Sequence, residues 1–211
     1  MYIPKHFNEA RNEKLHSLIE AYPLASLVTL KECFPEVNHI PMLLSRTHGS
    51  YGLLSGHIAR NNLLWQEHPI NTEVLVTFQG PNAYISPSWY ALKAETGKVV
   101  PTWNFISVQA RGHIRFIHDS EWLLQHLDAL TTQHEKQFAH PWHVADAPAD
   151  FTQSLTKAIV GFEIQITELK GKFKVSQNRS ASDIQSVIKG LSAIGNKPMV
   201  DFVKAYAPVV S

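Results

Sequence analysis

Cysteine is almost absent from this sequence, and long apolar runs are missing. The single cysteine, Cys33, excludes an internal disulfide and any zinc site built from cysteine thiolates. No segment approaches the ~18 consecutive apolar residues that suggest a membrane-spanning helix. The first residues, MYIPKHFNEARNEK, lack the apolar core of a signal peptide. We therefore expect a cytoplasmic protein.

A strong net charge and the common nucleotide-binding and hydrolase motifs are also lacking. The formal net charge is +1, which provides no overall basic field for non-specific nucleic-acid binding. No Gly-x-Gly-x-x-Gly, Walker A or Gly-x-Ser-x-Gly pattern occurs, so phosphoryl transfer and serine hydrolysis have no support. What is present is an ordinary globular composition: 211 residues, of which 44% are hydrophobic. This suits one domain, with room for a small appended lobe.

Short apolar segments separated by Pro, Gly and Asn dominate the chain and predict β-strands. They cover residues 24–30, 37–45, 50–58, 73–80, 82–87 and 100–117. Segment 159–175 also has strand character and could form one long hairpin that turns at Lys170-Gly171. Because helices are missing between most of these strands, the pattern favours a closed or half-closed antiparallel barrel over a doubly wound sheet.

Helices are predicted at the periphery of this sheet. The first begins at Asn8, as a plausible N-cap, and ends near Ala21, before Pro23. Others are predicted over residues 120–135, over a short segment that ends near residue 158, and over 182–206 in one or two pieces broken near Gly195 and Pro198. The predicted fold class is therefore mainly β with peripheral helices (α+β).

The stretch GHIARNN, residues 56–62, combines a histidine, an arginine and two asparagines where a strand pattern gives way to a helix pattern. Asn61 or Asn62 would cap the helix that follows, with Arg60 close to the free N–H groups of that helix. A helix N-terminus beside a permanent cation suits an anion. The alternative is an ordinary capping asparagine next to a solvated arginine.

Three further segments combine aromatic, amide and cationic side chains. They are FQGPNAYISPSWY at 78–90, VVPTWNF at 99–105 and KGKFKVSQNR at 170–179. Each has a simpler explanation by itself: aromatic packing for the first two and a basic hairpin tip for the third. Together they are typical of a site for a planar aromatic ligand that carries a phosphate, with aromatics and amides near the ring and cations near the anion.

The twelve histidines raise the question of a metal site. His140 and His143 are three residues apart, but Pro141 lies between them and no clear carboxylate partner is present. We therefore expect no metal site, and a loop packed by Trp142. Three other histidines lie on predicted strands and could line one end of a barrel, as in a haem-binding protein: His39, His57 and His113.

Eight motifs follow one another from Met1 to about Leu191: MYIPKHF, NHIPMLL, GHIARNN, VLVTFQGPNAYISPSWY, GKVVPTWNF, HPWHVADAPADF, AIVGFEI and GKFKVSQNR. In this order they resemble the PaiB family of FMN-binding negative transcriptional regulators. The resemblance implies an antiparallel split β-barrel related to the pyridoxamine-phosphate-oxidase-like flavoproteins. It also implies a homodimer with FMN at its interface. Residues 1–175 would form the FMN-binding barrel, and residues 176–211 a helical segment packed on it.

The resemblance also implies roles for particular residues. In the wider fold, basic and hydroxyl residues at the end of one strand hold the phosphate of FMN, and these roles fall on Ser55, Arg60 and Asn61, with His57 alongside. No residue receives a catalytic role. The candidate cofactor-binding residues are Asn38, Ser55, His57, Arg60, Asn61, Gln79, Thr102, Trp103, Asn104, Ser176 and Gln177.

Two functions remain open. The first is negative regulation of transcription with FMN as ligand, for which DNA would be a partner, although no helix-turn-helix pattern is visible. The second is a flavin-dependent oxidoreductase, in which FMN carries the redox chemistry, or a haem-binding relative. An enzyme requires an open pocket beside the flavin, whereas a regulator requires a basic surface on the dimer.

Overall fold

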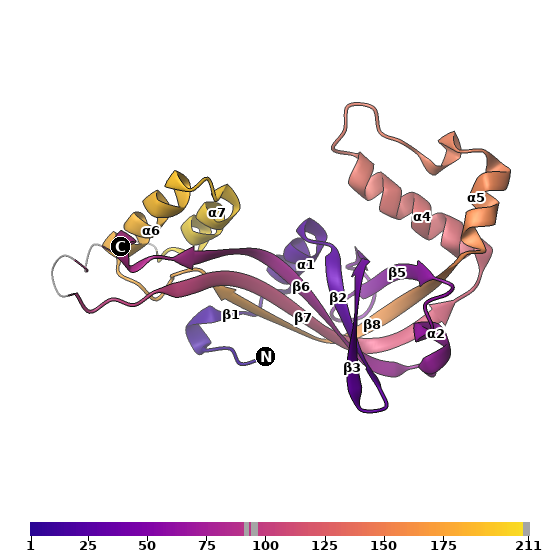
Figure 1. Cartoon of the computed structure of the whole chain (residues 1–211), viewed down its shortest axis with the longest axis horizontal. Helices are drawn as coiled ribbons and strands as arrows, with labels where there is room; N and C mark the ends of the chain where they lie inside the picture. Colours follow the sequence, from indigo (N-terminus) through magenta and orange to yellow (C-terminus); the bar gives the residue numbers. More distant parts are fainter. Residues whose placement is uncertain (91–92, 94–96, 209–211) are drawn as a thin grey trace. The chain divides into compact units, whose positions relative to one another are not determined.

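The computed structural model describes every residue except 91–92, 94–96 and 209–211. Its strands form one sheet in the order β3-β2-β6-β7-β8-β5-β4, with β1 paired to β8 (Figure 1). The pairs β2–β3, β2–β6, β4–β5 and β5–β8 are antiparallel. The strands are β1 (Asn8–Glu9), β2 (Leu24–Lys31), β3 (Phe34–Pro41), β4 (Leu43–Ser45), β5 (Leu53–Ala59), β6 (Thr72–Ile85), β7 (Thr102–Ile117) and β8 (Ile159–Lys174).

In the described part of the chain, helices lie before β1, between later strands and at the C-terminal end. They are η1 (Lys5–Phe7), α1 (Asn12–Ala21), α2 (Leu64–Glu67), η2 (Pro87–Trp89), α4 (Ser120–Glu135), η3 (Val144–Asp146), α5 (Ala149–Thr156), α6 (Ala181–Ala193) and α7 (Lys197–Tyr206). Within the described residues, none of these helices combines the length and the apolar character needed to span a membrane.

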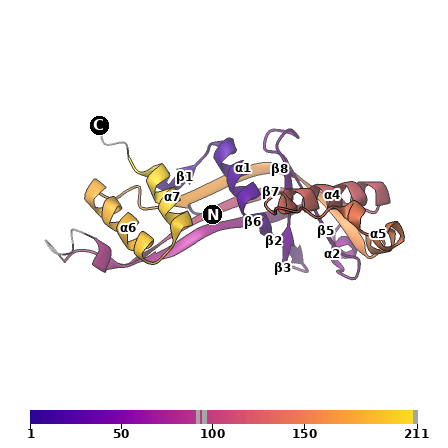
Figure 2. The same ribbon diagram turned by 90° about the horizontal axis from the view of Figure 1, so that it is seen from above.

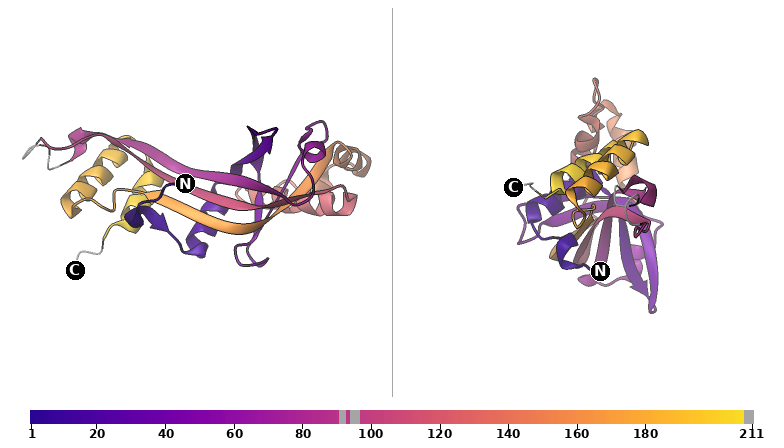
Figure 3. Two further views of the ribbon diagram at one scale, coloured as in Figure 1. Left: turned by 90° about the horizontal axis from the view of Figure 1, so that it is seen from below. Right: turned by 90° about the vertical axis from the view of Figure 1, so that its left-hand side faces the viewer.

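The chain forms two compact units, each assembled from separate segments. Unit 1 consists of Met1–Leu15, Gln79–Val108 and Lys170–Ser211, and unit 2 of His16–Phe78 and Gln109–Leu169. The long strands β6, β7 and β8 are neighbours in the sheet (Figure 3), and each contributes residues to both units. The boundary at residue 175 that the sequence suggests stays a prediction.

Unit 2 contains the curved part of the sheet. Burial alternates along β5, where Leu54 and Ile58 are buried while Ser55 and His57 face the other side. The outermost strand β3 contacts β5, and beyond β5 the Asn62 amide Nδ2 donates a hydrogen bond to Asn38 Oδ1 at 2.8 Å. The sheet therefore bends back on itself, as the predicted half-closed barrel requires.

Trp122 of α4 contacts Gly161 and Glu163 of β8 in unit 2, and α5 lies close to α4 (Figure 2). A glycine makes the helix packing possible. A Cβ atom at Gly161 would lie 2.3 Å from the Trp122 ring, so only glycine lets the indole lie directly on the strand.

Unit 1 is held together by its own apolar core and by one buried carboxylate. Phe173 at the end of β8 is 2% exposed and contacts the rings of Phe202 and Tyr206 on α7. The Glu9 carboxylate is buried and accepts hydrogen bonds from Arg11 and from the Tyr206 hydroxyl, the latter at 2.5 Å. The helices α6 and α7 pack on each other (Figure 2), and thus close this side of unit 1.

The structure confirms several predicted elements and corrects others. Helix α4 covers residues 120–135 as predicted, and the C-terminal segment forms two helices with a break at Gly195. The first helix, however, starts at Asn12 rather than at Asn8. Asn8 and Glu9 pair with Lys172 and Gly171 and form the short strand β1 instead.

Three predictions of strand boundaries are wrong. Residues 73–80 and 82–87 do not form separate strands, because β6 continues through Pro81 to Ile85. Residues 170–171 do not form a turn, because β8 continues to Lys174. The glycine at 171 serves close packing: a Cβ atom there would lie 2.2 Å from Leu15 Cδ2. The predicted strand 37–45 is divided into β3 and β4.

Candidate functional site

Unit 1 contains a small cavity lined by cations and neutral polar groups. Its volume is about 150 Å³, and its lining comes from η1, the start of β7, the end of β8 and the turn before α6: Phe7, Thr102, Asn104, Lys174, Ser176, Asn178 and Arg179. The lining includes two cations and no carboxylate. Such a set of donors favours an anionic group.

Lys174 is the central cation of this cavity. Its Nζ donates hydrogen bonds to Thr102 Oγ1 and to the Trp103 carbonyl oxygen, both at 2.5 Å. Burial lowers the pKa of the Lys174 ammonium, and the neighbouring charges of Arg179 and Lys172 lower it further. Both hydrogen-bond partners are neutral, so an anion in the cavity would relieve the repulsion between the cations.

A strained turn places the hydroxyl of Ser176 beside Lys174. Ser176 is 4% exposed and has φ 67°, a left-handed conformation that is unusual for a residue other than glycine. The amide Nδ2 of the buried Asn104 donates to Ser176 Oγ at 2.9 Å. The side chain of Gln177 stabilises the same turn, since its Oε1 accepts from the Val175 N–H and its Nε2 donates to the Phe173 carbonyl. Gln177 therefore shapes the turn.

Two exposed aromatic rings of unit 1 lie on β6 and β7. One of them, Trp103, stands between the cavity residues Thr102 and Asn104 in the sequence. Trp103 is 54% exposed and Tyr84 is 47% exposed, and their rings meet edge to face with centroids 6.1 Å apart. The Trp103 carbonyl accepts a hydrogen bond from Lys174, which ties this residue to the wall of the cavity. The pair offers apolar surface for a planar ring. Gln79 is exposed on β6, also in unit 1.

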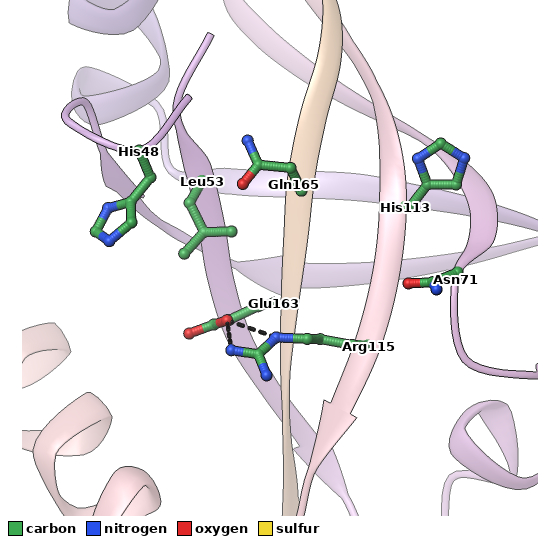
Figure 4. Close-up of a pocket in the computed structure, with 7 residues that line it drawn as sticks. All are labelled: His48, Leu53, Asn71, His113, Arg115, Glu163 and Gln165. Atoms are coloured by element: carbon green, nitrogen blue, oxygen red, sulfur yellow. Dashed lines mark hydrogen bonds and ion pairs between the residues drawn. The ribbon is translucent and has the colours of Figure 1, made fainter. Parts of the chain in front are cut away.

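Unit 2 contains two adjoining cavities that share the side chain of Glu163. The first has a volume of about 270 Å³, and Figure 4 shows its lining residues: His48, Leu53, Asn71, His113, Arg115, Glu163 and Gln165. Arg115 Nε and Nη2 donate to Glu163 Oε2 at 2.9 and 2.5 Å, and Trp122 Nε1 donates to Oε1 at 3.1 Å. The carboxylate is therefore held in one orientation.

The second cavity of unit 2 has a volume of about 460 Å³ and lies between α4 and the strands β4, β5 and β8. Ser55 and His126 are part of its lining. His126 Nε2 is 3.2 Å from His57 Nδ1, and the Trp122 ring is stacked on His126 with centroids 5.1 Å apart. Burial lowers the pKa of His126 to about 4, with a contribution from His57, and burial also lowers the pKa of His57. Both imidazoles are therefore neutral at pH 7 and add no positive charge to a phosphate site.

The arginine of the GHIARNN stretch bridges two backbone segments. Arg60 Nε donates to the Lys157 carbonyl at 2.6 Å, and Nη2 donates to the Ile159 carbonyl at 2.8 Å. The remaining nitrogen, Nη1, is 3.4 Å from His118 Nδ1. Asn62 Oδ1 accepts a hydrogen bond from the Leu64 N–H at the start of α2. The two carbonyl groups carry no formal charge, so they do not neutralise the guanidinium. The same hydrogen bonds hold two backbone segments together.

The sequence-predicted residues fall into two groups in different units. Unit 1 holds Gln79, Thr102, Trp103, Asn104, Ser176 and Gln177, and unit 2 holds Asn38, Ser55, His57, Arg60 and Asn61. Within unit 2, Ser55 and His57 lie under α4, whereas Arg60 bonds to the start of β8 and Asn61 is exposed.

Sequence reasoning did not single out several residues of these cavities. Lys174 and Arg179 belong to the basic segment 170–179, and the concentration of positive charge there could have indicated them in the sequence. His126 belongs to no recognisable motif and Glu163 is part of the AIVGFEI motif, but only the fold brings the two residues together with Trp122. Among the described residues, no group of three or more His, Cys, Asp or Glu side chains is arranged to hold a metal ion.

The unit 1 cavity fits part of a flavin cofactor. Its cations and the hydroxyl of Ser176 suit a phosphate group. Its volume of about 150 Å³ is below the roughly 300–1,000 Å³ of pockets that enclose a whole ligand. A flavin ring would therefore lie outside this cavity, against a more open surface.

Known proteins match the chain over most of its length. Residues 1–168 match a family model described as "Putative FMN-binding domain". An uncharacterised protein of Emericella nidulans is 36% identical over 230 residues, with 92% of each chain covered. The Bacillus subtilis protein named "Protease synthase and sporulation protein PAI 2" is 32% identical over 191 residues, which cover 90% of this chain and 89% of the relative.

A solved structure shares the fold. The FAD and haem binding protein from Mycobacterium smegmatis matches with a TM-score of 0.60 and 16% identity, over 80% of this chain and 73% of that protein. At this identity the likeness concerns the fold alone. Together with the strand order, it confirms an antiparallel fold of the split-barrel class with peripheral helices.

Proposed function

Because the chain belongs to this family of FMN-binding domains, we propose that it is a homodimeric FMN-binding protein that acts as a negative regulator of transcription. FMN is the cofactor that the family assigns to the chain. The resemblance to the PaiB family is confirmed by the family match and by the Bacillus subtilis relative. The observation that carries the FMN-binding part of the proposal is the unit 1 cavity, which is lined by two cations and no carboxylate.

Lys174, Arg179 and Ser176 would hold the FMN phosphate in this cavity. Phosphate oxygens accept hydrogen bonds from ammonium, guanidinium and hydroxyl groups, and the charged donors form the stronger bonds. Asn104 keeps the Ser176 hydroxyl in place through the bond at 2.9 Å. Arg60 in unit 2 is a second candidate for holding the phosphate. Its Nε and Nη2 bond to backbone carbonyls, whereas its Nη1 is 3.4 Å from His118 Nδ1 and bonds to no carbonyl.

The ring of FMN would lie on exposed apolar surface that a second copy covers. Trp103 and Tyr84 provide such a surface in unit 1. Unit 2 also exposes large apolar side chains on the β2–β3 hairpin: Leu30, Phe34 and Val37 are 66%, 78% and 54% exposed. Apolar side chains grouped on one hairpin are typical of protein interaction sites, and they support a homodimer. Bound FMN would supply the redox-active isoalloxazine ring if electron transfer takes place.

A flavin-dependent oxidoreductase is the second candidate function. The observation that favours it is the cavity of about 460 Å³ in unit 2, which has the size of a small-molecule pocket. The neutral His126 is part of its lining, so a ligand there would meet an uncharged imidazole. Turnover of a reduced nicotinamide cofactor with FMN-loaded protein would favour the enzyme, and FMN-dependent binding to a promoter fragment would favour the regulator.

The phosphate site is tested by titrating FMN and riboflavin into the protein and its Lys174→Met variant. Methionine keeps the length of the side chain and removes its charge. A charge-assisted hydrogen bond contributes about 1.5–3 kcal/mol, so FMN should bind roughly tenfold to a hundredfold more weakly. Riboflavin, which lacks the phosphate, should bind both proteins alike.

Two further variants make this test decisive. Lys197→Met is the matched control, because Lys197 is exposed, pairs with Asp201 at 2.8 Å and does not line the cavity. It should leave the FMN affinity unchanged. If Arg60→Ala produces the loss that is specific for FMN while Lys174→Met does not, the phosphate lies at the Arg60 corner and the unit 1 assignment is wrong.

A further inference from the structure

Charge is divided very unevenly between the two units, although the whole chain is nearly neutral. Unit 1 contains twelve Lys and Arg against five Asp and Glu, a net charge of +7. Unit 2 contains seven Lys and Arg against thirteen Asp and Glu, a net charge of −6. Each unit therefore produces a field of its own, which the total of +1 conceals.

Residues 119–157, which we call the acidic segment, carry a net charge of −4 out of the −6 of unit 2. It spans α4, η3 and α5 and contains six acidic residues against two lysines. Several of its carboxylates are bonded to backbone N–H groups: Asp119 to Trp122, Glu135 to Trp142 and Asp146 to His143. These partners carry no formal charge, so the negative charge of the carboxylates is not neutralised by them.

The acidic segment also exposes apolar side chains. Phe138, Trp142, Phe151 and Leu155 are 56%, 45%, 54% and 49% exposed. Unit 1 also combines exposed apolar residues with exposed charged residues, but its charge is positive. Its exposed apolar residues include Val100, Trp103 and Ile194 at 65%, 54% and 61%, and its exposed lysines include Lys189 and Lys204. Exposed apolar and charged side chains together are the groups from which protein–protein interfaces are built.

We propose that the homodimer is reciprocal, with unit 1 of each copy docked on the acidic segment of the other copy. The inference rests on the dimer of the proposed function and adds these two surfaces to the exposed β2–β3 hairpin. A twofold axis makes the two contacts equivalent and leaves neither surface open for a third copy. Charge favours this pairing over the alternative, because two units of +7 or two of −6 would repel each other.

A second copy is the partner that the charges favour over a nucleic acid. DNA would be attracted to unit 1 but repelled by the net charge of −6 on unit 2. The acidic segment, in contrast, carries both the charge and the exposed apolar side chains that unit 1 would require of its partner. Binding of DNA by unit 1 is therefore an outcome that the test must separate.

The first test is sedimentation of the full chain at 50 and 500 mM NaCl. Salt screens attraction between exposed charges, because the Debye length falls from about 10 Å at 0.1 M to about 3 Å at 1 M. The dimer dissociation constant should rise roughly tenfold or more between the two salt concentrations. A dimer that is equally tight or tighter at 500 mM would overturn the reciprocal arrangement while leaving the proposed dimer intact.

The second test uses charge reversal on the two surfaces. One variant carries Lys189→Glu and Lys204→Glu in unit 1, and the other carries Glu121→Lys and Asp128→Lys in the acidic segment; all four positions are exposed. Each variant alone should dimerise roughly tenfold more weakly than the parent at 50 mM NaCl. An equimolar mixture should form more dimer than either variant alone, because each altered surface then meets its complement.

Controls keep the outcomes apart. The double variant Lys189→Arg and Lys204→Arg preserves the charge and should dimerise like the parent. Circular dichroism establishes that each variant is folded. If the unit 1 reversal abolishes binding to duplex DNA but leaves the dimer unchanged, the basic unit faces nucleic acid and the inference is wrong. A monomer under all conditions would contradict the proposed dimer itself, whereas FMN titration still reports on the cofactor site.

Discussion

Asn104 and Ser176 form a fully buried polar pair, with the Asn104 amide Nδ2 donating to Ser176 Oγ at 2.9 Å. The pair joins β7 to the turn after β8, although its members are 72 positions apart in the sequence. It holds Ser176 in a left-handed conformation, φ 67°, that costs a residue with a Cβ atom about 1–2 kcal/mol. The Asn104–Ser176 hydrogen bond therefore stabilises a strained backbone conformation, and the shape of the unit 1 cavity depends on it.

Replacement of Ser176 should separate the hydrogen bond from the strain. Ser176→Ala loses the hydroxyl and keeps the strain, and it leaves the buried Asn104 amide without this acceptor, at a cost of about 1–3 kcal/mol. Ser176→Gly also loses the hydroxyl but relieves the strain. Urea unfolding should therefore show the glycine variant to be more stable than the alanine variant by about 1 kcal/mol. Equal stability of the two variants would mean that the turn is not strained.

The protein should lose stability on mild acidification because of His126. Its pKa is lowered from 6.5 to about 4 by burial and by His57, so the unfolded chain binds the proton more tightly than the folded one. Stability from this group is complete above pH 6.5 and is lost as the pH falls toward 4, by roughly 2–3 kcal/mol. Unfolding at pH 7.5 and at pH 5 measures the loss. His126→Leu should reduce it, whereas the exposed His140→Gln should not.

Loss of the Tyr206 hydroxyl should weaken unit 1. Burial raises the pKa of the Glu9 carboxyl, but hydrogen bonds from Arg11 and Tyr206 outweigh this effect and lower it to about 2. The resulting stability is present above pH 4.5 and is lost as the pH falls toward 2. Tyr206→Phe should cost about 1.5–3 kcal/mol at pH 7 and shift acid unfolding to a higher pH. Tyr2→Phe, at a residue that is 82% exposed, should change neither property.

Arg60→Ala should destabilise the protein even without a ligand. The guanidinium donates to the carbonyls of Lys157 and Ile159, and loss of these two hydrogen bonds should cost about 1–3 kcal/mol in urea unfolding. Arg111→Ala is the matched control. Its ion pair with Glu73, at 3.7 Å, joins two exposed side chains and should contribute close to nothing. If Arg60→Ala is as stable as the control variant, the bridge between the two backbone segments has no stabilising effect.

Local signals in the sequence were sufficient for helix α4 and for the class of the fold. Asp119 accepts a hydrogen bond from the Trp122 N–H and caps α4, which agrees with the helix start predicted at residue 120. The alternation of residues along β5 also puts Ser55 and His57 on the face opposite the buried Leu54 and Ile58. These features depend on neighbouring residues, so the sequence alone contains them.

Other features depend on contacts between distant residues and could not be predicted. Gly171 resembles a turn signal in the sequence, but the fold requires it because Leu15 packs against the strand at that position. His126 looks like any histidine on an amphipathic helix until the fold places it beside His57. The basic segment 170–179 was visible, but which of its cations meets Thr102 is decided by the register of β7 and β8.

The path of the chain between the two units has a consequence for unfolding. The chain crosses from one unit to the other after residues 15, 78, 108 and 169, and these crossings lie inside α1, β6, β7 and β8. Melting one unit alone would interrupt a helix and three strands in their middle, at the cost of their hydrogen bonds. The two units should therefore melt in a single cooperative transition, and no contiguous fragment of the chain contains either unit. Because each crossing lies inside a helix or a strand, a protease acting on the folded protein should not cut at the crossings.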